Sequence, residues 1–297
     1  MRTQEPKLAH MDPRFAPWFS GYRIDLEPRA AIRARLAQPT RFWMEAVKST
    51  TWEQPKEIDP RGWFDIHNQG NQGSCQGQSL ADSGEYCAVI ADGVEIQLSR
   101  SYAYLASQEI DGLLGRDNGS TLEGGTKAIA DGLPLEQDLP YTDNYSSAVS
   151  AYRSKKASLR AGKLWKCKGE VQISTADEAR AFLAGWTGCV QIGIDWSIKL
   201  VDGWEIQTYR AGNTGGHAIL ICGYLAVEKW ASEGGYGLLL KNSHSTQWAR
   251  NGWALVKPSA FNSMMKSKWA VGIGRSDMQS PEPRAERCDN YRSIVKQ

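Results

Sequence analysis

The sequence lacks several features that mark common classes of protein. It contains no run of five or more like charges, and 35 basic residues nearly balance 33 acidic ones. Charge therefore indicates neither a nucleic-acid partner nor a membrane surface. No segment is long and apolar enough to span a bilayer. Prolines and charges break residues 1–28, which have no apolar core, so we predict no secretory signal.

Cysteine and histidine are scarce, and their spacing excludes further classes. The six cysteines form none of the C-x-x-C pairs typical of metal or redox centres, so we expect free thiols in a reducing compartment and no metal or cofactor. Only four histidines, His10, His67, His217 and His244, are available as a base. A cysteine with a histidine and an asparagine elsewhere in the chain is a candidate nucleophile.

Helical periodicity dominates the first half of the chain, and short apolar strands dominate the second half. We predict helices from about Ser74 to Gly93 and over residues 98–110, 120–132 and 175–185, and strands over residues 189–196, 217–225, 236–243 and 252–258. This order favours an α+β protein with two subdomains and a site in the cleft between them.

The segment NQGNQGSCQGQS, residues 68–79, contains the strongest candidate nucleophile. Cys75 is expected in the first turn of the helix that starts near Ser74. A helix N-terminus and a nearby imidazolium both stabilise a thiolate and lower the pKa of the thiol. Cys75 therefore needs a histidine from elsewhere in the chain.

His217 and Asn242 are the best candidates for the base and its partner. His217 begins the apolar segment HAILICGYL directly after the glycines of GNTGGH, which predicts a ring at a strand end. Asn242 follows the strand YGLLL in KNSHSTQW. An asparagine there can accept the second ring N–H of a histidine and fix its orientation.

Together these segments resemble the papain-like cysteine peptidases, in which glutamine, cysteine, histidine and asparagine follow in that order. The matching segments are NQGNQGSC, LSRSYAYLAS, EGGTKAIADGLPLEQDLPY, GGHAILICGY and LLLKNSHSTQW. The separation of Cys75 from His217 also falls within the roughly 130 to 150 residues typical of that family.

The resemblance implies a fold, an activity and a set of site residues. It implies an α+β papain-like fold, in which a helical and a β-barrel-like subdomain flank the cleft. It implies hydrolysis of a protein or peptide substrate, with Cys75 as nucleophile, His217 as base and acid, and Asn242 as orienter. Gln69 would be the oxyanion glutamine. The expected substrate-binding residues are Gly124, Gly125, Gly216 and Trp248.

The resemblance also divides the chain. It covers residues 57–275, and leaves an N-terminal extension over residues 1–56 and a tail over residues 276–297. The extension contains no long charged helix of the kind that inhibits family zymogens, so we expect it to pack on the main domain or to dock on a partner.

Three departures from the family pattern leave alternatives open. Gln76 stands where a tryptophan usually follows the nucleophile, which is closer to bacterial and phage-encoded relatives and suggests a cytoplasmic or virion protein. His244 stands where an aromatic residue usually shields the histidine and asparagine, and Gly216 replaces a frequent aspartate. The alternatives are a catalytically silent structural or binding module, for example of a phage virion, and a thiol enzyme that acts on peptidoglycan.

The doubled triplet Asn-Gln-Gly allows two alignments. In the second, Gln72 would be the oxyanion glutamine, Gln78 would replace the nucleophile and Cys75 would be a disulfide cysteine. The segment RDNGSTLEGG contains no partner cysteine for that disulfide. We therefore favour the alignment that pairs Gln69 with Cys75, because it agrees with the other segments.

Overall fold

The computed structural model describes residues 55–92, 95–167, 170–185, 188–212, 215–266 and 269–274. The predicted tail, all but the last two residues of the predicted extension, and His10 and Cys288 lie outside these ranges. No helix in the described ranges is both long and apolar enough to cross a membrane.

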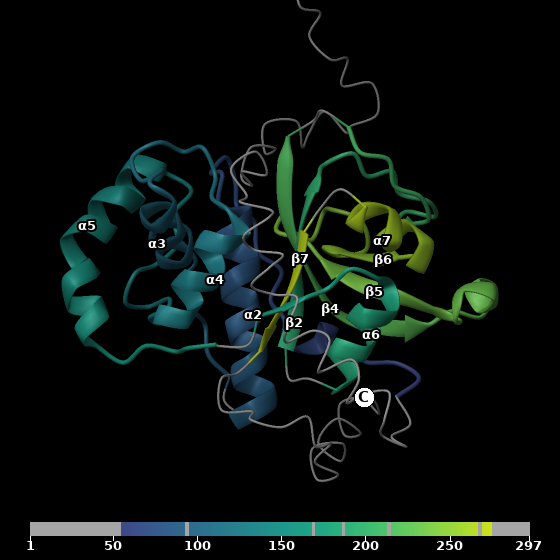
Figure 1. The fold of residues 1–297 in the computed structure, drawn as a ribbon. Coiled ribbons are helices and arrows are strands. Elements are labelled where there is room, and N and C mark those ends of the chain that lie inside the picture. The colour runs from purple at the N-terminus through teal and green to yellow at the C-terminus, as the bar shows by residue number, and fades with distance from the viewer. Residues whose placement is uncertain are drawn as a thin grey trace, which may run out of the picture.

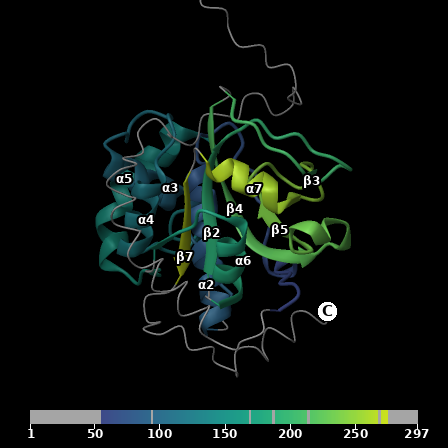
Figure 2. The same ribbon diagram turned by 45° about the vertical axis from the view of Figure 1, so that its right-hand side comes forward.

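Helices cover both faces of a central sheet (Figures 1 and 2). The helix that contains the candidate nucleophile, α2, lies between the sheet and the other helices of the first half. That half consists of η3 (Arg61–Trp63), α2 (Cys75–Asp92), α3 (Arg100–Asp111), α4 (Leu122–Asp131) and α5 (Tyr145–Ala161). The opposite face of the sheet is covered by α6 (Ala176–Gly185) and α7 (Pro258–Met265). The predicted α+β class is confirmed.

The sheet has seven strands in the order β1-β7-β2-β4-β5-β6-β3 in the described part of the chain. The strands are β1 (Glu170–Gln172), β2 (Gly188–Asp195), β3 (Glu205–Ile206), β4 (Gly216–Ala226), β5 (Tyr236–Lys241), β6 (Trp253–Val256) and β7 (Trp269–Gly274), and η4 (Glu228–Glu233) precedes β5. All neighbours are antiparallel except β3 and β6. In the described ranges β1 and β3 are the two ends of this strand order.

Side-chain alternation along β4 and β5 determines what faces α2. In β4, Ile219 and Ile221 belong to the large core beneath α6 and α7, whereas Ala218 belongs to the core around α2. In β5, Leu240 faces the first core and Lys241 contacts α2. Successive residues of a strand point to opposite faces, so the side chains of His217 and Asn242 lie on the face away from α2.

The predicted helix ends agree with the observed caps. Thr121 accepts a hydrogen bond from the backbone of Gly124 and begins α4, and Thr175 accepts one from Glu178 at the start of α6. Gly132 ends α4 with a positive φ of 113°. The sequence pattern did not predict α5, α7 or β7.

Candidate active site

Cys75 is the first residue of α2 and lies against β4. Its Sγ accepts a hydrogen bond from the backbone N–H of Ala218 at 3.3 Å. The side chain is fully buried. Burial raises the pKa of the Cys75 thiol to about 12, although the N–H groups of Ala218 and Gln76 favour the thiolate. In this conformation the thiol is therefore neutral, and three backbone N–H groups, including that of Cys75, are arranged to stabilise a negative sulfur.

His217 and Asn242 meet on the other side of the same strand. His217 Nε2 lies 2.8 Å from Asn242 Oδ1, and the backbone N–H of Ser243 donates to that oxygen at 2.8 Å. His217 is fully buried, and its Nδ1 has no hydrogen-bond partner among the described residues. Burial lowers the pKa of His217 to about 4, although the bond to Asn242 acts in the opposite direction. The structure thus joins the predicted base and orienter, and leaves one ring nitrogen available for a proton.

A group of aromatic rings surrounds His217. Trp196 packs edge-on against the His217 ring with centroids 4.4 Å apart, and His244 stacks on it at 4.7 Å. The ring centroids of Trp248 and Trp196 are 5.8 Å apart, so Trp248 packs on the ring that contacts His217. The sequence analysis missed Trp196. The pairing of the strand that precedes Trp196 could have revealed it. Strand β2 pairs with β4 through Ile194 and His217, so the residues that follow Ile194 lie close to the histidine.

Gln69 contacts the turn that follows Asn242. Its backbone N–H donates to the carbonyl of Ser243 at 2.9 Å, and its Oε1 accepts from the Ser243 hydroxyl at 2.6 Å. Its Nε2 donates to the carbonyl of Gln72 at 3.0 Å. Gln72 itself donates to the carbonyl of Thr142. Of the two glutamines in the doubled triplet, Gln69 is therefore the one that contacts the orienter turn.

A comparison with known families identifies the family of the chain. The family model described as "Papain family cysteine protease" matches residues 54–272. The chain belongs to the papain family of cysteine proteases. It is thus a thiol protease, and family membership implies a protein or peptide substrate. A search of curated proteins found no match.

Solved structures of cysteine proteases share the fold of this papain-family chain. The proform of Amb a 11, a ragweed pollen allergen, has a TM-score of 0.63 at 16% identity, over 88% of this chain and 76% of that one. Xylellain from Xylella fastidiosa has a TM-score of 0.56 at 18% identity, over 78% of this chain and 89% of that one. Bromelain from Ananas comosus, in complex with the E64 inhibitor, has a TM-score of 0.58 at 15% identity, over 75% of this chain and 100% of that one. These similarities confirm the papain-like fold.

Gly124 and Gly125, the expected partners of a substrate backbone, pack closely against other side chains of the protease. Both residues lie in the first turn of α4, where their N–H groups are bonded to the hydroxyl and the carbonyl of Thr121. A Cβ on Gly124 would lie 2.4 Å from Asp111 Oδ1, and a Cβ on Gly125 would lie 1.6 Å from Gln76 Nε2. Because helix α4 already occupies these N–H groups, an extended peptide cannot pair with them there.

Alanine in place of Gly125 is expected to lower the free energy of unfolding by about 1–3 kcal/mol, because it overpacks the contact with Gln76. The expected loss exceeds the gain of about 1 kcal/mol in helix propensity. Urea denaturation measures the change. In a Gln76→Ala background the same substitution should instead stabilise the protein. An unchanged or higher stability of the single variant would contradict this account of Gly125.

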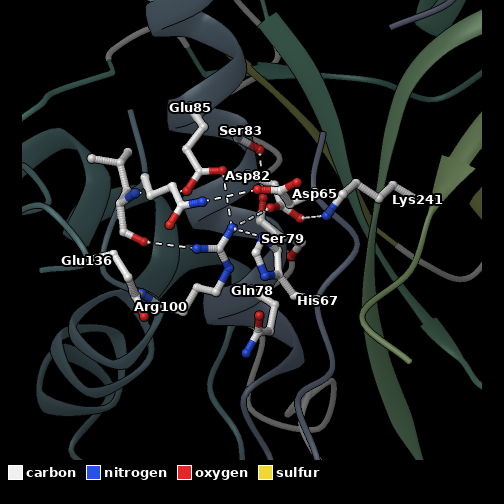
Figure 3. A network of polar contacts seen from close by, with 12 residues as sticks. Asp65, His67, Gln78, Ser79, Asp82, Ser83, Glu85, Arg100, Glu136 and Lys241 are labelled. Carbon is white, nitrogen blue, oxygen red and sulfur yellow. Dashed lines mark hydrogen bonds and ion pairs between the residues drawn. The ribbon is translucent and has the colours of Figure 1, made fainter. Parts of the chain in front are cut away.

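A buried network of charges surrounds Arg100 (Figure 3). Arg100 Nη2 is 3.1 Å from Asp82 Oδ1, 3.1 Å from Glu85 Oε2 and 2.5 Å from His67 Nε2. Lys241 forms an ion pair with the other oxygen of Asp82. The network joins α2, α3 and β5 to the segment that precedes Gln69. It therefore ties together the elements that contain Cys75, Gln69 and Asn242.

The surroundings shift the pKa values of Asp82, Glu85 and His67. Burial alone would raise the pKa of Asp82, but the charges of Lys241 and Arg100 outweigh it and hold the pKa below its usual value. Burial raises the pKa of Glu85 to about 7, and burial together with the charge of Arg100 lowers the pKa of His67 to about 4. His67 is therefore neutral at pH 7, and its ring is committed to Arg100.

His67, Asp82 and Glu85 bring three potential metal ligands within 4.8 Å of one another. The guanidinium of Arg100 contacts all three groups, so a cation of the chain itself already lies among them. A metal ion at the same place would meet that positive charge at close range. The network is better described as an ion-pair cluster than as a metal centre.

Proposed function

We propose that Cys75, His217, Asn242 and Gln69 form the catalytic machinery of this thiol protease. The observation that carries the proposal is the pair of contacts made by consecutive residues of β4. His217 binds Asn242 at 2.8 Å, and the next residue, Ala218, donates its N–H to the Cys75 sulfur at 3.3 Å. Consecutive residues of one strand thus contact the orienter, through the His217 side chain, and the thiol, through the Ala218 backbone.

In the proposed reaction the Cys75 thiol transfers its proton to His217 Nδ1, and the sulfur attacks the scissile carbonyl carbon. The new C–S bond converts the carbonyl oxygen to an oxyanion. His217 then gives its proton to the leaving amine as the C–N bond breaks, which leaves a thioester on Cys75. Water deprotonated by His217 hydrolyses that thioester and restores the thiol.

Two N–H donors are proposed to bind the oxyanion. They are the backbone N–H of Cys75, at the start of α2, and the Gln69 side-chain amide. The amide has two hydrogens on Nε2, of which the bond to the Gln72 carbonyl uses one. The loss of one such donor typically costs about 3 kcal/mol of transition-state stabilisation.

Asn242 would keep the ring of His217 in place throughout. Since Oδ1 accepts from Nε2, the remaining nitrogen, Nδ1, is the one that exchanges the proton with sulfur. Gly216, which directly precedes His217, and Trp248, which packs on Trp196, remain our candidates for substrate contacts.

Iodoacetamide labelling at about pH 6 tests the assignment of Cys75. We expect Cys75 to react far faster than the equally buried Cys87, Cys189 and Cys222, because backbone N–H groups at the start of α2 favour its thiolate and His217 is its proposed base. Peptide mapping by mass spectrometry gives the rate at each thiol. A His217→Ala variant should remove the advantage of Cys75. Equal, slow labelling of all these thiols would contradict the proposal.

Several finer assignments are proposals as well. We infer a bacterial or phage origin from Gln76 in place of tryptophan and, with it, a cytoplasmic or virion location. We also propose that the protease domain spans residues 57–275, that residues 276–297 form a tail, and that residues 1–56 dock on this domain or on a partner protein. Removal of residues 1–56 with measurement of proteolysis and solubility tests that last role.

A further inference from the structure

His244 occupies an unusual place beside the proposed catalytic residues. It is fully buried, its ring stacks on His217 at 4.7 Å with an interplanar angle of 24°, and the edge of Trp196 lies against it at 5.4 Å. Its Nδ1 is 3.1 Å from Asn242 Nδ2. A second histidine therefore contacts both the base and the orienter.

The Ser243 backbone determines which way the Asn242 amide faces. The N–H of Ser243 is a donor, so the Asn242 atom 2.8 Å away from it must be the oxygen. The same oxygen faces His217 Nε2, which must then carry a hydrogen. The other end of the amide, Nδ2, faces His244 Nδ1 as a donor.

These directions define the state of His244. A nitrogen that accepts from an amide N–H has no hydrogen of its own, so Nδ1 is unprotonated and a neutral ring has its hydrogen on Nε2. A proton on Nδ1 would set two donors against each other, 3.1 Å apart. Burial, and then the neighbouring His217, hold the pKa of His244 well below its usual value, which is consistent with a neutral ring.

We propose that His244 is a positioning residue for catalysis, and that it accepts the Asn242 Nδ2 hydrogen so that Oδ1 stays directed at His217. The stacked ring also covers one face of His217. The aromatic side chain expected at this position would cover the histidine but would not accept the amide hydrogen. The proposal rests on the roles assigned above to His217 and Asn242.

The tautomer of His244 provides a test that is independent of proteolysis. We expect an imidazole ¹H–¹⁵N spectrum of a Cys75→Ala variant at pH 7 to show His244 with an unprotonated Nδ1 and a protonated Nε2. Its signals are identified by their disappearance in a His244→Asn variant of the same protein. A hydrogen on Nδ1 would overturn the proposal, whether or not the enzyme cleaves a given substrate.

Two substitutions in the active enzyme separate acceptance of the hydrogen from covering of the ring. His244→Phe keeps an aromatic ring and removes the acceptor, so we expect kcat to fall about tenfold while KM changes less than twofold. His244→Asn removes the ring, but its Oδ1 can take the place of Nδ1, so we expect kcat within about threefold of the wild type.

The order of the two variants is the decisive result. A kcat that survives in the phenylalanine variant and falls in the asparagine variant would show that only the cover matters, and would overturn the proposal. Equal losses in both variants, with KM raised as well, would indicate a structural role and also overturn it. Absence of proteolysis in every form, including the wild type, would count against the assigned catalytic roles and leave the tautomer result intact.

Discussion

Replacement of Cys75 by alanine is expected to abolish hydrolysis of denatured casein, with a loss in kcat on the order of 10⁴-fold or more. The reason is that no thioester forms without the sulfur, and the remaining groups only bind and polarise the substrate. Alanine removes one buried atom from the first turn of α2, so the fold should survive. Release of soluble peptides, with circular dichroism as the check on folding, measures the effect.

Cys87 provides the matched control. It lies on the same helix, is also fully buried, and has its sulfur 3.8 Å from the carbonyl oxygen of Ile273. Cys87→Ala should retain most of the wild-type kcat. Activity that persisted in the Cys75→Ala variant, or that disappeared equally in both variants, would show that the nucleophile is not Cys75.

The sequence could indicate the proposed catalytic residues because their positions follow local rules. Cys75 begins α2, His217 is the second residue of β4 and Asn242 directly follows β5, so all three lie at the boundaries of elements that the sequence pattern indicates. The alignment of the doubled triplet was also decided by sequence, and Gln69 is the glutamine that contacts Ser243. Such features depend on neighbours along the chain.

Other features depend on neighbours in space, and a sequence pattern does not report them. Trp196 reaches His217 only because β2 pairs with β4, and Arg100 is buried only because Asp82 and Glu85 of α2 face it. Helix α5 escaped prediction because it buries only Ala148, Val149 and Tyr152, which is too few for a continuous apolar stripe.

The glycine pair of α4 also depends on neighbours in space. The family resemblance suggested backbone exposed to a substrate, whereas helix formation uses the same N–H groups internally. Gln76 explains the second glycine, since its side chain lies where a Cβ would be. Gln76, which departs from the family pattern, and Gly125 on another helix thus form one packing contact.

Asp82→Asn is expected to lower the free energy of unfolding by about 3–5 kcal/mol, the cost of breaking a buried ion pair. Asp82 is the anion that contacts both Lys241 and Arg100, and the side chains of these two cations are 1% and 2% exposed. An amide of the same shape leaves both positive charges with less compensation. Urea denaturation at pH 7 measures the change through the shift of the midpoint.

Two further variants show whether charge, rather than shape, causes the loss. Asp202→Asn makes the same chemical change in an exposed pair, where Lys229 lies 3.9 Å away, and should cost less than about 1 kcal/mol. The double variant Asp82→Leu with Lys241→Met removes both charges and should recover much of the stability, because apolar groups often replace a buried pair at little cost. If Asp82→Asn unfolds at the urea concentration of the wild type, the network does not hold α2 to β5. Asn242 directly follows Lys241 in the chain. A stable Asp82→Asn enzyme with unchanged kcat would therefore also show that the network does not position Asn242.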